Sequence, residues 1–123
     1  MDVEHPRFVA GDNVAMKVPL HRFDATVRFY RDTVGLPPIE VAPPSACFAF
    51  GALRLWIDPV PQIGHAELWL ELRTPDLARA AARLQSAGVV RCDAIEALPP
   101  DLSACWISNP AGIVHLLREE PVS

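Results

Sequence analysis

The chain lacks several features, and each absence excludes a class of protein. None of its apolar runs approaches the roughly 20 residues that cross a membrane. Lys and Arg form no basic cluster that could neutralise phosphates, and the net charge is −4. We therefore expect neither a membrane nor a nucleic-acid partner. The N-terminal residues MDVEHPRF are polar and acidic, so we expect no signal peptide.

Cysteine is scarce and follows no recognisable pattern. Cys47, Cys92 and Cys105 lack the spacing of metal or redox sites, which predicts reduced, mostly buried thiols and a cytoplasmic location. Half of the 123 residues are hydrophobic and 21% are charged, an ordinary composition for a globular protein. This length predicts one domain that spans residues 1–123.

Residues 64–73, GHAELWLELR, alternate between two kinds of side chain, which predicts a half-buried strand. The apolar face consists of Ala66, Leu68, Leu70 and Leu72. The other face consists of His65, Glu67, Trp69 and Glu71. A face that only meets water would explain the two glutamates but explains a tryptophan and a histidine less well, so the residues alone leave open whether this face meets water or lines a site.

The pattern of a strand followed by a helix occurs twice. One copy begins at Asn13 and the other at His65, and Asp24 and Asp76 lie at matching distances into them as expected helix N-caps. Gly35 and Gly88 are expected to end the two helices. The helix stripes predicted to face the core are Val27, Tyr30 and Val34 in the first copy, and Leu77, Ala80, Ala81 and Leu84 in the second.

The segments after the helices match as well. Cys47 and Phe48 in ACFAF correspond to Cys105 and Trp106 in ACWIS. We therefore predict an α+β fold of two tandem β-α-β-β-β modules, at about 12–60 and 64–119. Two such modules can form a concave half-barrel sheet with the helices outside.

Three motifs carry a resemblance to a known family: NVAMKV, DATVRFYRDTVGL and NPAGIVHLLRE. The chain resembles the glyoxalase/bleomycin-resistance/dioxygenase superfamily, also called the vicinal oxygen chelate superfamily. The resemblance implies a homodimer and places the family's metal-ligand positions at Asn13, Trp56, His65 and His115. His65 matches the usual ligand and His115 is a ligand-capable substitute, whereas Asn13 and Trp56 depart from the pattern.

The resemblance also directs the face of His65 into a cavity that binds a small molecule. Trp56 and Trp69 would form its aromatic walls. Alternatively, Lys17 and Glu67 only pair with each other, and Cys47 and Cys105 are expected to pack rather than react. The candidate ligand-binding residues are Asn13, Lys17, Arg54, Trp56, His65, Glu67, Trp69, Trp106 and His115.

Three uses of such a cavity follow. The first is a metal-free protein that sequesters a planar or cationic metabolite or antibiotic. The second is a divalent-metal-dependent lyase, isomerase or dioxygenase, in which His65 and His115 hold a weakly bound metal ion and Glu67 completes the site as the catalytic carboxylate. The third is a metal-independent acid–base enzyme that uses one of these histidines with Glu67.

Overall fold

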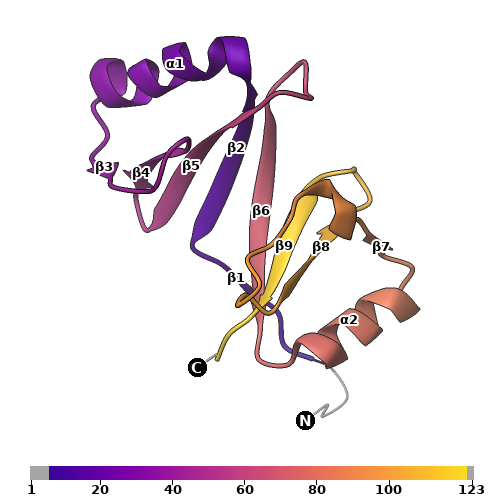
Figure 1. Cartoon of the computed structure of the whole chain (residues 1–123). Helices are drawn as coiled ribbons and strands as arrows, with labels where there is room; N and C mark the ends of the chain where they lie inside the picture. Colours follow the sequence, from indigo (N-terminus) through magenta and orange to yellow (C-terminus); the bar gives the residue numbers. More distant parts are fainter. Residues whose placement is uncertain (1–5, 122–123) are drawn as a thin grey trace. The chain divides into compact units, whose positions relative to one another are not determined.

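The computed structural model describes residues 6–121 and has the predicted α+β composition of helices and a mixed sheet (Figure 1). The chain divides into two compact units. The first unit is formed by residues 12–69, and the second by residues 70–123 together with the N-terminal segment up to Gly11. Strand β6 (Glu67–Thr74) contributes to both. The prediction of one domain over residues 1–123 stays a prediction.

The first unit has one helical segment and one sheet. Its elements are β2 (Asn13–Pro19), α1 (Leu20–Arg28), the π-helical turn η1 (Phe29–Val34), β3 (Pro38–Ile39), β4 (Ala46–Phe50), β5 (Leu53–Val60) and the start of β6. The strands are ordered β3-β4-β5-β2-β6. β2 runs parallel to β5, and the other neighbours are antiparallel.

The second unit repeats this element order. It contains β1 (Val9–Ala10), the rest of β6, α2 (Leu77–Ser86), β7 (Val90–Arg91), the 3-10 turn η2 (Asp93–Ile95), β8 (Ala104–Ser108) and β9 (Val114–Glu119). The strands are ordered β6-β9-β8-β7, and β1 pairs with β6. Each unit is therefore a β-α-β-β-β module, as the repeat predicts. β6 begins at Glu67, so the predicted start of this strand near His65 is wrong.

One face of the first sheet packs against α1. Val18, Phe48, Leu55 and Ile57 form its buried core. Phe23, Val27 and Tyr30 from the helical segment pack against this core. Val14 and Met16 of β2 pack against it as well, and because side chains alternate along a strand, the residues between these core positions are directed to the opposite face.

The first helical segment begins earlier than predicted and ends differently. α1 starts at Leu20, directly after Pro19, so Asp24 lies inside the helix and is not its N-cap. Gly35 ends the segment with a φ of 79°, and its N–H donates to the carbonyl of Tyr30. This wider turn rotates the last residues, which leaves Val34 half exposed and outside the predicted stripe.

The second helix follows its sequence signals. The carboxylate of Asp76 accepts the N–H of Arg79 at 3.1 Å as an N-cap, and Gly88 ends the helix with a φ of 80°. The core under α2 consists of Ala80, Cys105, Ile107 and Leu117. Leu72, Leu77 and Leu84 pack against it, whereas Leu68 and Leu70 of β6 are 48% and 41% exposed.

The proposed equivalence of the two cysteine strands is wrong by one position. Cys105 faces the helix in its unit. In the first unit it is Phe48 that faces the helix, whereas Cys47 pairs with Trp56 on the other side. A shift of one residue moves every side chain of a strand to the opposite face.

The motif NPAG forms the turn that was expected before the last strand. The side-chain oxygen of Asn109 accepts the N–H groups of Ala111 and Ile113, both at 2.9 Å. Gly112 adopts a φ of 84°, which glycine reaches without strain. No helix within residues 6–121 is long and apolar enough to cross a membrane.

The core of the first unit should dominate its stability. Ile57→Ala removes a side chain that is 0% exposed, and we expect it to lower the free energy of unfolding by about 2–5 kcal/mol. Leu68→Ala, at a position that is 48% exposed, is the matched control and should cost far less. Urea denaturation measures both, and equal losses would contradict the packing described above.

Candidate functional site

The first unit carries a polar surface on the side of its sheet away from α1. In the β2–β5 pair, Asn13 lies beside Arg54 and Lys17 beside Asp58, and in the β2–β6 pair Lys17 lies beside Glu67. Residues paired in this way project to the same side of a sheet. We call this surface the polar face, and its members are Asn13, Lys17, Arg54, Trp56, Asp58, Glu67 and Trp69. Glu67 and Trp69 therefore share one side of β6, as strand alternation predicts, and a ligand-binding role for this face stays a prediction.

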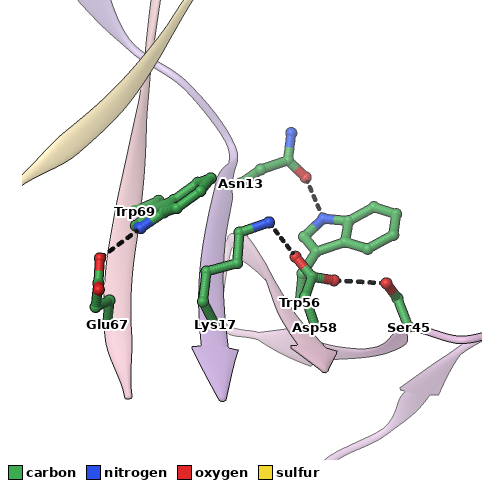
Figure 2. A network of polar contacts seen from close by, with 7 residues as sticks. All are labelled: Asn13, Lys17, Ser45, Trp56, Asp58, Glu67 and Trp69. Atoms are coloured by element: carbon green, nitrogen blue, oxygen red, sulfur yellow. Dashed lines mark hydrogen bonds and ion pairs between the residues drawn. The ribbon is translucent and has the colours of Figure 1, made fainter. Parts of the chain in front are cut away.

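A buried ion pair lies at one end of the polar face (Figure 2). The ammonium of Lys17 is 2.8 Å from a carboxylate oxygen of Asp58, and the two side chains are only 4% and 17% exposed. The hydroxyl of Ser45 donates to the other oxygen of Asp58 at 2.6 Å. Both oxygens of the carboxylate are therefore used, which offsets the cost of burying the charges.

Lys17 also lies over an aromatic ring. Its ammonium is 4.3 Å from the centre of the Trp69 ring, a cation–π contact. The indole N–H of Trp69 donates to Glu67 at 3.1 Å. Lys17 therefore pairs with Asp58, a partner that the sequence did not predict, and the pairing of Lys17 with Glu67 stays a prediction. The sequence placed Asp58 on one face with Arg54 and Trp56 but did not predict its contacts with Lys17 and Ser45, because the parallel pairing of β2 with β5 joins segments about 40 residues apart.

A second polar contact fixes the other tryptophan. The indole N–H of Trp56 donates to the side-chain oxygen of Asn13 at 2.8 Å (Figure 2). Asn13 is in register with Arg54 and not with Trp56 itself, so this bond draws the indole toward the Arg54 end of the face. Trp56 is partly exposed, whereas Trp69 is buried. Trp56 is thus the aromatic side chain of the polar face that a ligand can reach.

The thiol beside Trp56 is not a reactive group. Cys47 is 3% exposed, and burial raises the pKa of its thiol, although the nearby Arg54 guanidinium acts in the opposite direction. Burial likewise raises the pKa of Cys105 in the second unit. A raised pKa keeps a thiol protonated and a poor nucleophile at neutral pH. Both cysteines pack, as expected from the sequence.

The candidate residues of the second unit are arranged differently from the prediction. His115 lies beside Ile107 in the β8–β9 pair, and Leu117, two residues further, is fully buried in the core under α2. The ring of His115 is therefore on the α2 side, and the face predicted for it was wrong. Trp106 is on the opposite side but only 5% exposed, and its indole N–H donates to the carbonyl of Glu96.

His65 is exposed and lies in the bend before β6. It belongs to the first unit, whereas His115 belongs to the second. Within the part of the chain that the structure describes, no group of three or more His, Cys, Asp and Glu side chains is arranged to hold a metal ion. The metal role of the two histidines stays a prediction.

Glu71 is a buried carboxylate that the sequence placed on the same face as Glu67. It lies in the second unit, 3.6 Å from the guanidinium of Arg118, and its side chain is 4% exposed. A side chain at position 11 would collide with the side chain of Glu71, which explains why this position is a glycine. Glu71 therefore has a structural contact of its own and does not belong to the polar face.

No protein-family model matches the sequence, and no curated protein matches it. Solved structures do match the fold. The chain is similar to a Mn(II)-bound glyoxalase from Novosphingobium aromaticivorans, with 17% identity, a TM-score of 0.67, and coverage of 97% of this chain and 44% of that one. It spans less than half the length of that protein.

Two further structures are similar over most of both chains. For methylmalonyl-CoA epimerase from Mycobacterium tuberculosis, the identity is 19%, the TM-score is 0.61, and the match covers 92% of this chain and 89% of that one. For a glyoxalase/bleomycin resistance protein/dioxygenase superfamily member from Vibrio splendidus 12B01, the corresponding values are 9%, 0.59, 87% and 97%. At these identities the likeness establishes the fold alone.

The buried ion pair should be strongly coupled. We expect Lys17→Met and Asp58→Leu each to lower the free energy of unfolding by about 3 kcal/mol, because each leaves a buried charge without its partner. The double variant should lose much less than the sum. The exposed pair Arg31–Asp32 is the control, and its cycle should show little coupling. Additive losses for Lys17 and Asp58 would show that the pair is not formed.

Proposed function

We propose that this chain, which has the fold of the glyoxalase/bleomycin-resistance/dioxygenase superfamily, binds a small molecule on the polar face of its first unit without a metal ion. The supporting observation is the hydrogen bond between Trp56 and Asn13. These residues occupy two of the positions at which the resemblance places metal ligands. In this chain they bind each other.

The donor atoms at these positions do not suit a metal ion. The indole nitrogen of Trp56 is a donor only and has no lone pair to offer. The side-chain oxygen of Asn13 accepts the indole N–H at 2.8 Å, which orients it toward the ring. A neutral amide oxygen is a weak ligand for transition metals in any case. The first unit therefore keeps only His65 as a suitable ligand at the family positions.

The chemistry of the polar face favours a planar ligand. Trp56 offers a partly exposed aromatic surface that its hydrogen bond holds in one orientation. A fixed ring binds a planar molecule at a lower entropic cost than a mobile one. Of the two ligand types expected from the sequence, a cation is the less suitable, because the ring of Trp69 already carries the ammonium of Lys17.

The metal-dependent enzyme with His65, His115 and Glu67 is less well supported. The carboxylate of Glu67 accepts the indole N–H of Trp69, and the ring of His115 is on the α2 side of its sheet. One carboxylate oxygen of Glu67 is thus engaged by Trp69, and His115 is not a residue of the polar face. The homodimer implied by the resemblance remains part of the proposal, because exposed apolar side chains such as Phe29 and Val90 leave surface for an interface.

The proposal predicts that the purified, untagged protein carries far less than one metal ion per chain. Elemental analysis before and after incubation with Zn²⁺ or Mn²⁺ measures this. His65→Ala and His115→Ala should change little, and His21→Ala, an exposed histidine on α1, is the control. One metal ion per chain that is lost with either His65 or His115, but not with His21, would favour the enzyme instead.

Ligand binding should depend on Trp56 and not on metal. In the presence of EDTA, we expect Trp56→Ala to weaken binding of a planar aromatic compound by about tenfold or more, because the stacking surface is lost. Trp56→Phe keeps an aromatic ring and should retain part of the affinity. Calorimetric titration of naphthalene-based compounds provides the measurement. Binding that is abolished by EDTA would contradict the proposal.

A further inference from the structure

The charges of the polar face are unevenly distributed along its strands. Lys17, Asp58 and Glu67 lie in one row of the register, whereas Arg54 lies beside Asn13, four residues further back along β2. At about 3.3 Å per residue, the two rows are roughly 13 Å apart along the strands. This exceeds the Debye length of about 8 Å at physiological ionic strength. Arg54 therefore makes one end of the face cationic.

Arg54 is not neutralised within its own unit. Its side chain is exposed and makes no hydrogen bond or ion pair with any residue in the range 6–121. By contrast, Lys17 is paired with Asp58 at 2.8 Å. Asp12, which precedes β2, contacts Arg54 through its backbone carbonyl, which accepts the N–H of Arg54 at 2.7 Å. The guanidinium thus keeps its donors available for a ligand.

The available aromatic ring is next to this guanidinium in the fold. Trp56 lies two residues from Arg54 on the same face of β5, and its indole is drawn toward the row of Arg54 by the bond to Asn13. The cross-strand neighbours on this face are small, with Ala15 beside Trp56 and Ala49 beside Arg54. A flat ring and a planar cation are therefore juxtaposed, and the residues paired to them on β2 and β4 are Asn13, Ala15, Cys47 and Ala49, none of them bulky.

We propose that the ligand is a planar aromatic carboxylate, whose ring stacks on Trp56 and whose carboxylate pairs with the guanidinium of Arg54. This inference rests on the proposed function and names the ligand class for the same face. The guanidinium fork matches a carboxylate in a bidentate geometry, and such charge-assisted bonds are stronger than neutral ones. An anionic ligand is thus proposed in place of the cationic ligand that the sequence had left open as an alternative.

Three naphthalene probes of similar shape separate charge from stacking. We would titrate 2-naphthoate, 2-naphthamide and 2-naphthylmethylammonium calorimetrically into the full chain in EDTA. The carboxylate should bind about tenfold more tightly than the amide, and the cation most weakly. Arg54→Gln should remove the preference for the carboxylate without weakening the amide. Arg54→Lys should restore part of it, since the charge returns without the fork.

The control variant is Arg22→Gln, which removes an exposed guanidinium on α1, on the other side of the same sheet. If Arg22→Gln and Arg54→Gln lose the same carboxylate affinity, the effect comes from the net charge of the protein and not from a contact with Arg54. That result would overturn the inference. If all probes bind equally to the wild type and to Arg54→Gln, but not to Trp56→Ala, the carboxylate is wrong and the proposed function stands. If no probe binds, both are wrong.

Discussion

The alternation of side chains along β2 and β5 is the constraint on which the first unit depends. It places Val18 and Ile57 against α1 and directs Lys17 and Trp56 to the opposite side. The same alternation sets the neighbours on that side, because the parallel register pairs each residue of β2 with one residue of β5. The core and the polar face are thus two results of one backbone arrangement, and a change of register would disturb both.

Two polar contacts organise the polar face in different ways. The buried pair of Lys17 and Asp58 joins two charges that are largely removed from solvent at one end of the face. The bond from Trp56 to Asn13 joins neutral groups and fixes an aromatic ring that stays partly exposed. At two positions where the resemblance places metal ligands, this unit has Asn13 and the indole ring of Trp56, and the guanidinium of Arg54 lies on the same face. In the proposed function, such a surface would bind a ligand by shape and charge.

Much of this arrangement could be predicted from the sequence. The predictions that failed concern strand register and the pairing of distant strands, which local sequence signals do not determine. Asp76, Gly88 and the turn at Asn109 act locally, so their signals were sufficient. The face of His115 was wrong because a register error of one residue reverses a strand. The contact of Lys17 with Asp58 could not be predicted, because it depends on which distant strand lies alongside β2. The hydrogen bond from the indole of Trp69 to Glu67 depends likewise on the folded arrangement of side chains.

The central claim is that Trp56 and Asn13 bind each other in place of a metal ion. The indole N–H signals of the three tryptophans, resolved in a ¹H–¹⁵N correlation spectrum and assigned by Trp→Phe substitutions, test it most directly. We predict that Asn13→Ala shifts the Trp56 signal and speeds its exchange with solvent, whereas excess Mn²⁺ does not broaden it in the wild type. The account would be contradicted if the Trp56 signal did not change in Asn13→Ala. Selective broadening of that signal by one equivalent of Mn²⁺ would contradict it as well.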